Sequence, residues 1–174
     1  GSTVSDLPVA IEWCGGRRAC DLAGRITFHA RRRGIKWAVV DYLQLVRPST
    51  SRRGGSREED TSQSVDELKA AAGAAGVGLV VCSQLRRLGP GEQEPRPNAH
   101  DLRNSGMIEA QADAVMLIWR HDRSNYARAM LILAKHKHGA QGARDLLWLP
   151  HRGAYRRDEQ PMPVPVHRGP YAED

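Results

Sequence analysis

Two runs of apolar residues mark the centre of the chain. Residues 37–43 (WAVVDYL) and 78–85 (GLVVCSQL) pass through consecutive apolar positions and then become polar. Continuous runs of this kind are typical of buried strands in a parallel sheet. Residues 47–56 predict a loop rich in Pro, Ser, Arg and Gly, and residues 58–75 predict an alanine-rich helix. The order strand, loop, helix, strand predicts a crossover unit of an open α/β sheet.

The segment before these runs predicts a second unit of the same kind. Residues 7–13 favour a short strand. Residues 17–33 favour a helix, because apolar residues recur every four positions from Leu22 and the pattern ends at Gly34. The first half of the chain therefore has the alternating order of an α/β fold.

Three further strands are predicted downstream, over residues 114–120, 129–137 and 144–149. No helix-length segment connects them, so we expect an antiparallel or mixed extension of the sheet. Four prolines make the last fourteen residues a poor candidate for regular structure. These patterns divide the chain into three parts: a tag or leader (1–6), an α/β core (7–156) and a flexible tail (157–174).

The charge balance favours polyanionic partners without establishing one. Lys and Arg total 26 against 20 Asp and Glu, which gives a net charge of +6 in 174 residues. Simple solubility is the alternative. No apolar run approaches the roughly 20 residues of a membrane span and no basic-then-apolar leader opens the chain, so we expect a cytoplasmic protein. The three cysteines form no CxxC pair and are expected to be reduced.

Polar residues stand at the ends of both central strands. Asp41 follows four apolar residues, where a carboxylate is costly unless a cation or hydrogen-bond donors meet it. In nucleotide-binding α/β proteins such an aspartate holds magnesium through water, although the pattern alone fits a turn better. Ser83 and Gln84 end the next strand, where the Gln84 amide suits a phosphate oxygen or is an ordinary strand-end amide. The two polar ends together are better evidence than either alone.

A loop after the second central strand carries groups suited to a nucleic-acid backbone. In the segment HDLRNSG, Arg103 supplies a cation, Asn104 a polar side chain and Gly106 a site of close backbone approach. This combination suits the phosphates of a single strand. By spacing alone, however, a solvated turn is favoured.

Basic residues also end the longest downstream strand. Lys135 and Lys137 are two residues apart, so on a strand both side chains point the same way and suit one phosphate. His136 and His138 share the other face at a spacing that metals use. No third ligand lies nearby, and a metal site is therefore not expected there.

A phosphate-cradling loop is missing from these motifs. The chain contains no GxxxxGK[ST] segment, and none of its four lysines precedes Ser or Thr. Hydrolysis of a nucleotide by this chain alone is therefore doubtful.

Taken in order, these segments resemble the C-terminal RecA-like motor domain of the DnaB-family replicative helicases. The matching text is VVDYLQLV, the helix around ELKA, VVCSQLRR, DLRNSGMIEAQADAVMLIWR and LILAKHKHGAQG. The resemblance covers about residues 7–156. It implies a RecA-like α/β fold with a mainly parallel sheet flanked by helices and antiparallel C-terminal strands. It also implies a partial domain, because the Walker A segment and the catalytic glutamate would precede residue 1.

The resemblance assigns roles to the strand ends. Asp41 matches the Walker B aspartate that orders magnesium, and Gln84 matches the glutamine that couples the γ-phosphate to the DNA loops. Lys135 matches a lysine that reaches the neighbouring subunit's nucleotide. Lys137 stands at the arginine-finger position, where lysine keeps the charge but loses the planar fork, so weaker catalysis is expected.

The resemblance also assigns a role to the basic loop. Arg103, Asn104 and Gly106 match the central-channel loop that contacts the backbone of single-stranded DNA. Asn104 replaces the more usual glutamate, which removes a negative charge beside DNA.

These roles imply part of a hexameric, ATP- and magnesium-dependent replicative DNA helicase that translocates on single-stranded DNA and unwinds duplex. The expected partners are single-stranded DNA, further copies in a homo-hexamer, and a complementing N-terminal half or a helicase loader. Two alternatives stay open. One is a non-catalytic nucleic-acid-binding or assembly module that has lost ATPase function, and the other, weaker one is a RecA-type recombinase-like ATPase.

Overall fold

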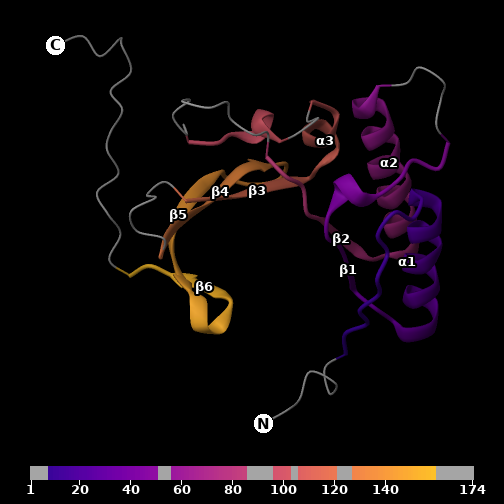
Figure 1. Cartoon of the computed structure of the whole chain (residues 1–174), viewed down its shortest axis with the longest axis horizontal. Coiled ribbons are helices and arrows are strands. Elements are labelled where there is room, and N and C mark those ends of the chain that lie inside the picture. Colours follow the sequence, from indigo (N-terminus) through magenta and orange to yellow (C-terminus); the bar gives the residue numbers. More distant parts are fainter. Residues whose placement is uncertain (1–7, 51–55, 86–95, 103–105, 121–126, 160–174) are drawn as a thin grey trace. The chain divides into compact units, whose positions relative to one another are not determined.

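The computed structural model describes residues 8–50, 56–85, 96–102, 106–120 and 127–159. The chain divides into two compact units (Figure 1). The first unit consists of Gly1–Arg87 and His100–Gln111, and the second of Leu88–Ala99 and Ala112–Asp174.

The first unit contains a parallel pair of strands packed against helices. Strands β1 and β2 are aligned from the pair Trp37 and Gly78 to the pair Val40 and Val81. The parallel pairing predicted from the two apolar runs is therefore confirmed. In chain order the elements are α1 (Ala19–Arg33), β1 (Trp37–Val40), a 3-10 turn η2 (Leu43–Leu45), α2 (Arg57–Ala75), β2 (Gly78–Val81) and α3 (Gly106–Gln111).

Local sequence signals explain where the two long helices begin and end. At the start of α2, the Ser56 side chain accepts a hydrogen bond from the Glu59 backbone N–H, and the Glu59 carboxylate accepts one from the Ser56 backbone N–H. This capping box satisfies two otherwise unpaired donors. Helices α1 and α2 end at Gly34 and Gly76, whose φ angles of 63° and 66° are left-handed and favour glycine.

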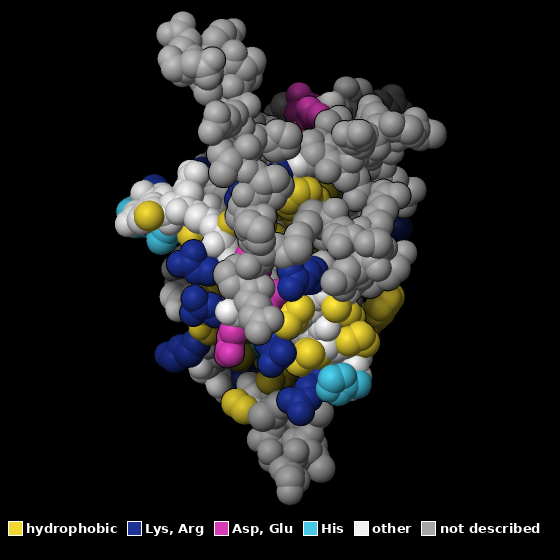
Figure 2. Space-filling model, turned by 90° about the vertical axis from the view of Figure 1, so that its left-hand side faces the viewer, with side chains coloured by type: hydrophobic (Ala, Val, Ile, Leu, Met, Phe, Trp, Pro, Cys, Tyr) yellow, Lys and Arg dark blue, Asp and Glu magenta, His cyan; other side chains and the backbone are white. Residues whose placement is uncertain are grey.

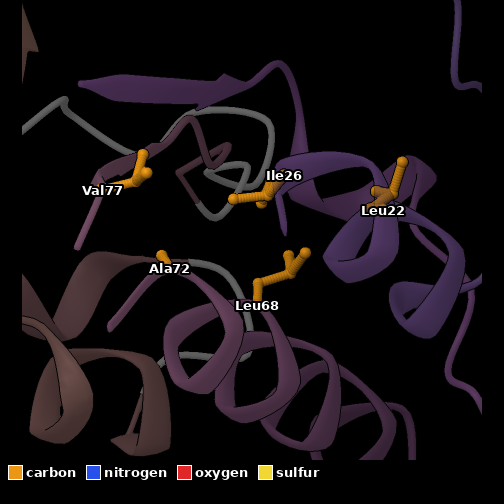
Figure 3. Close-up of a cluster of buried hydrophobic side chains, with 5 residues drawn as sticks. All are labelled: Leu22, Ile26, Leu68, Ala72 and Val77. Atoms are coloured by element: carbon orange, nitrogen blue, oxygen red, sulfur yellow. The ribbon is translucent and has the colours of Figure 1, made fainter. Parts of the chain in front are cut away.

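The core of the first unit lies between α1, α2 and one face of the strand pair. Its buried side chains are aliphatic and come from three elements or their ends (Figure 3): Leu22, Ile26, Leu68, Ala72 and Val77. Ala38, Val40 and Leu79 of the strands pack against this cluster. The four-residue spacing that predicted α1 is therefore the spacing of its buried face.

The prediction that both central strands are buried is wrong for one face of the pair. Trp37 and Val39 are 68% and 65% exposed, and Val80 is 38% exposed. Alternate residues of a strand point to opposite faces, and α1 and α2 cover only the face formed by residues such as Ala38. We call the exposed surface formed by Trp37, Val39 and Val80 the bare face.

The strand predicted over residues 7–13 is absent from the described part, residues 8–13. Val9, Ile11 and Trp13 in this segment are exposed. The segment is attached to α1 through the side chain of Glu12 instead of through a backbone ladder. An apolar pattern predicts a strand only where a hydrogen-bonding edge meets it, and the pattern does not reveal that edge.

The second unit is an antiparallel sheet of four strands in the order β3-β4-β5-β6. The strands are β3 (Ala114–Trp119), β4 (Arg128–His136), β5 (Gly142–Leu149) and β6 (Ala154–Arg157). The three predicted strands and their antiparallel pairing are confirmed, but β6 was not predicted. Within the described ranges no ladder joins these strands to β1 or β2, whereas the sequence predicted an extension of that sheet. Each β strand is close in sequence to the next and pairs with it.

Regular structure extends past residue 156. Arg157 belongs to β6, and the following Asp158 is buried and forms an ion pair with Arg128 of β4 at 3.6 Å. The rest of the expected tail lies outside the described residues from residue 160 onward. No helix in the described part combines the length and the apolar character that crossing a bilayer requires.

Candidate functional site

The predicted site residues Asp41 and Gln84 both follow strands of the parallel pair. Asp41 comes directly after β1, Gln84 comes three residues after β2, and both side chains are exposed. Because β1 and β2 run in parallel and Val40 is level with Val81, the two residues lie at the same edge of the pair. No hydrogen bond or ion pair joins either side chain to another residue within the described segments, so both present free polar groups.

The backbone after β1 crosses over to the end of β2. The Cys82 N–H donates to the Val40 carbonyl at 2.9 Å, and the Leu43 N–H donates to the Cys82 carbonyl at 2.9 Å. Leu43 is buried and anchors the turn η2. The Asp41–Tyr42 peptide bond within this crossing is cis. These bonds fix the backbone on both sides of Asp41.

Gln44 is a functional candidate that the sequence reasoning missed. Its side-chain amide Nε2 donates to Ser83 Oγ at 2.9 Å, and its Oε1 accepts from the Gln84 backbone N–H at 3.4 Å. The only signal in the sequence is a polar residue between the two leucines of LQL. That signal gives no partner, because Ser83 lies 39 residues further along the chain.

The pKa of the Cys82 thiol, which directly follows β2, is affected by both burial and charge. Burial raises the pKa of the Cys82 thiol, and the neighbouring Asp41 carboxylate raises it further, because a second negative charge is disfavoured beside it. Cys14, Cys20 and Cys82 are all free thiols, as predicted from their number and spacing.

A large cavity of about 1110 Å³ runs along β1 in the first unit. Trp37, Val39 and Asp41 line it from the strand side, and Val9 and Trp13 line it from the segment before α1. The cavity therefore joins the bare face to the carboxylate that the sequence marked as functional.

A charged cluster lies at one wall of this cavity. Glu12 accepts two hydrogen bonds from the Arg25 guanidinium, one of them from Nε at 2.8 Å, and its Oε1 lies 2.7 Å from His29 Nε2. These bonds, first those of Arg25 and then that of His29, lower the pKa of Glu12 from 4.5 to about 2. The His29 ring is buried, and its Nδ1 has no partner within the described segments. The cluster ties the segment before α1 to that helix.

The predicted DNA loop is only partly described. Arg103 and Asn104 lie outside the described residues, and Gly106 begins α3. The other end of α3 is attached to α2 through Gln111. Its side-chain amide donates to Asp66 Oδ1 at 2.5 Å and to Ser62 Oγ at 3.2 Å, and Lys69 Nζ donates to the Gln111 carbonyl. The helix that follows the loop is thereby held on α2.

Lys135 and Lys137 belong to the second unit. Lys135 lies in β4 opposite Val115 of β3. Strand β4 ends at His136, so the expectation that both lysines lie on one strand is wrong for Lys137. Its backbone N–H donates to the Asp113 carbonyl at 2.8 Å, and its Nζ lies 3.6 Å from Asp113 Oδ1 with both side chains largely exposed. An exposed pair of this kind is weak, so the Lys137 charge is readily available to another anion.

No group of three or more His, Cys, Asp or Glu side chains within the described ranges is arranged to hold a metal ion. His136 and His138 therefore belong to no such group. A magnesium ion at Asp41 would need oxygen ligands from water and from a nucleotide.

The edge of the second unit carries an arginine and aromatic cluster that the sequence reasoning also missed. The Arg120 guanidinium lies 5.7 Å from the Trp148 ring centre and donates to the Tyr155 hydroxyl at 3.1 Å. The Trp148 and Tyr155 ring centres are 4.7 Å apart. Figure 2 shows Lys and Arg side chains exposed on the side of the molecule where β5 and β6 lie. Exposed arginines of this region are Arg144, Arg152, Arg156 and Arg157.

A family model and curated relatives of this chain point to the same protein family. The family model described as DnaB-like helicase C terminal domain matches residues 2–157. The replicative DNA helicase DnaB of Leifsonia xyli subsp. xyli is 32% identical over 142 residues, which are 78% of this chain and 30% of that protein. The DnaB of Geobacillus stearothermophilus is 30% identical over 152 residues, which are 84% of this chain and 33% of that protein. The chain thus spans about a third of the length of these curated relatives.

Solved structures agree with this result. A solved ATPase domain superposes with a TM-score of 0.69 at 26% identity, covering 82% of this chain and 52% of that one. A structure of a DnaB-like replicative helicase and its interactions with primase gives a TM-score of 0.67 at 26% identity, covering 80% of this chain and 36% of that one. The RecA-like arrangement expected from the sequence, as part of a longer domain, is therefore confirmed.

Proposed function

We infer a function from the family: the chain belongs to the DnaB-like helicase C-terminal domains, and we propose that it is part of an ATP-dependent replicative DNA helicase motor. The motor translocates on single-stranded DNA and unwinds duplex. The observation that carries this proposal is the pair of free polar groups, Asp41 and Gln84, at one edge of a parallel strand pair in a chain of this family. A replicative motor of this kind would act in the cytoplasm.

In this proposal Asp41 orders magnesium through water, and Gln84 contacts the γ-phosphate of ATP. An exposed carboxylate without a competing partner among the described residues fits such an ion, because magnesium prefers oxygen ligands and retains several waters. When bound, magnesium neutralises charge on the triphosphate. The Gln84 amide can donate to a phosphate oxygen or orient a water molecule.

Lys135 and Lys137 act in this proposal on the nucleotide of a neighbouring subunit in a homo-hexamer. Two ammonium groups stabilise anionic oxygens electrostatically. Lys137 lacks the fork of an arginine and binds one oxygen at a time, so weaker transition-state stabilisation follows. The exposure of Lys137 and its weak pairing with Asp113 support this role.

Arg103, Asn104 and Gly106 contact the DNA backbone in this proposal. The attachment of α3 to α2 supports it, because a loop must be held by a rigid element in order to transmit force. Helicase loaders and primase-type partners would act on the assembled ring.

The exposure of the bare face is evidence for a complementing segment, which would carry Walker A. Parallel sheets are covered on both faces, yet Trp37, Val39 and Val80 are exposed here. The chain covers 52% of the solved ATPase domain, so about half of that domain has no counterpart in it. We propose that the segment with Walker A packs on the bare face and completes the nucleotide site.

The proposal is tested by supplying the Walker A half of the Geobacillus stearothermophilus DnaB domain, fused or mixed with this chain. DNA-stimulated ATP hydrolysis is expected in the complemented protein and not in either half. Asp41→Ala should abolish it while the circular dichroism spectrum stays unchanged. Retained hydrolysis in the Asp41→Ala protein would remove Asp41 from its role.

A second measurement separates the motor from a nucleic-acid-binding module. Arg103→Ala should weaken single-stranded DNA binding and reduce the slope of log affinity against log salt by about one. DNA binding by the chain, together with no ATP binding in the complemented protein, would favour the module.

A further inference from the structure

Gln44 connects the two strand ends that carry the proposed ATPase residues. Its amide nitrogen donates to the Ser83 hydroxyl and its amide oxygen accepts from the Gln84 backbone N–H, so both ends of one side chain bind neighbouring residues. Gln44 itself stands in η2, three residues after Asp41. One planar group therefore spans the gap between the Asp41 turn and the segment after β2.

The bonds of Gln44 act beyond the last pair of the strand ladder. The ladder ends at Val40 and Val81, and among the described residues the backbone bonds between the two strand ends continue only as far as Cys82. Within the described segments, the bonds that hold Ser83 and the Gln84 backbone on the β1 side are those of Gln44. The direction in which the Gln84 side chain leaves the backbone therefore depends on Gln44.

We propose that Gln44 is a positioning residue for ATP hydrolysis, which holds Gln84 at the distance from Asp41 that the reaction requires. This inference rests on the proposed function, since it assigns a support to the same site. Gln44 touches neither nucleotide nor DNA in this proposal. Its effect is on geometry, and small displacements of a catalytic group cost large factors in rate.

The first experiment uses this chain alone and measures hydrogen exchange of the Gln84 backbone amide by NMR. Gln44→Ala should accelerate that exchange roughly tenfold, because the amide loses its acceptor. Gln63→Ala is the matched control: Gln63 donates to Thr50 and Glu67 and to neither Ser83 nor Gln84 among the described residues, so its loss should leave the Gln84 amide unchanged. Equal exchange in both variants would overturn the proposal.

The second experiment measures ATPase kinetics in the complemented protein. Gln44→Ala should lower kcat roughly tenfold with little change in KM for ATP, whereas Gln63→Ala should change neither. Ser83→Ala should produce part of the loss, and the double variant should be no worse than Gln44→Ala, because both changes remove the same bond. Additive losses, or kcat equal to the control, would overturn the positioning role.

The two arms separate this inference from the proposed function. An active wild-type protein with a normal Gln44→Ala variant refutes only the positioning role. An inactive wild-type protein refutes the proposed function and with it the catalytic consequence, while the exchange measurement still decides whether Gln44 holds the Gln84 backbone.

Discussion

The two faces of the β1–β2 pair have similar sequences and opposite surroundings. On one face Ala38 and Val40 pack against a cluster that includes Leu68, which is fully buried. On the other, Trp37 and Val39 are mostly exposed. The residues of both faces alternate within the four-residue run WAVV, so the difference lies in what covers them. The comparison teaches that apolar character in a strand records the surroundings the sequence requires, including a cover that the described residues of the first unit do not supply.

The proposed function depends on both faces. The packing of the covered face stabilises the strand pair, in which Val40 is level with Val81. Asp41 and Gln84 therefore lie at the same edge of the pair. The bare face leads along the cavity to the same Asp41. In the proposed motor one face supplies stability and the other receives the segment that brings the phosphate loop.

The largest expected effect is the contrast between one deletion on each face. Leu68→Ala should lower the free energy of unfolding by about 2–5 kcal/mol, because it leaves a cavity in the core. Val39→Ala should change it by at most about 0.5 kcal/mol, because Val39 is already 65% exposed. Urea denaturation followed by circular dichroism measures both. A loss of more than about 2 kcal/mol for Val39→Ala would mean that the bare face is covered within the chain.

In the complemented protein the bare face is expected to be covered, so a change there should have a large effect. There Val39→Asp should weaken association of the Walker A half by roughly a hundredfold, because a charge would be buried without a partner. Glu58→Gln on the exposed start of α2 serves as a control for surface charge and should leave association unchanged. Analytical ultracentrifugation gives both affinities. Equal affinities for the wild type and Val39→Asp would show that the bare face is not the docking surface.

The sequence predicted the two long helices and both strands of the first unit, but it did not predict that one face of the strand pair is exposed. The spacing of Leu22 and Ile26 predicted α1, Gly34 predicted its end, and the run before Asp41 predicted β1. These signals are local, because each depends on the periodicity or the backbone preference of neighbouring residues. The bare face was missed, because an apolar run gives the need for burial and not the element that provides it.

The candidate site was also predicted only in part. The polar residues at the strand ends were visible because they interrupt apolar runs, and their common edge follows from parallel pairing. Gln44 was invisible, since its partners Ser83 and Gln84 come close only when the strands pair. Strand β6 was missed because AYRR has too few apolar residues to show alternation.

A smaller effect is expected from the helix that covers the core. Ser56→Ala should lower the free energy of unfolding by about 1 kcal/mol, because it removes the side-chain acceptor of the capping box at α2. Thr61→Ala removes a hydroxyl from the same helix that, among the described residues, donates to the Arg57 carbonyl one turn before it, and it should cost less. Urea denaturation compares the two variants. Equal losses would show that the cap does not contribute to the stability of the covered face.

The smallest effect concerns the segment beside the bare face, which the Glu12 cluster ties to α1. The folded pKa of Glu12, about 2, lies below its ordinary value of 4.5 because Arg25 and His29 donate to the carboxylate. Its contribution is therefore fully present above pH 4.5 and is lost as the pH falls toward about 2. The NMR signal of the Trp13 indole should move through this window in the wild type. In Glu12→Gln it should already be shifted at neutral pH and show no such titration, whereas Asp21→Asn, in the first turn of α1, should behave as the wild type. A titration that survives in Glu12→Gln would assign the movement of the segment to another group and leave the cavity wall independent of this cluster.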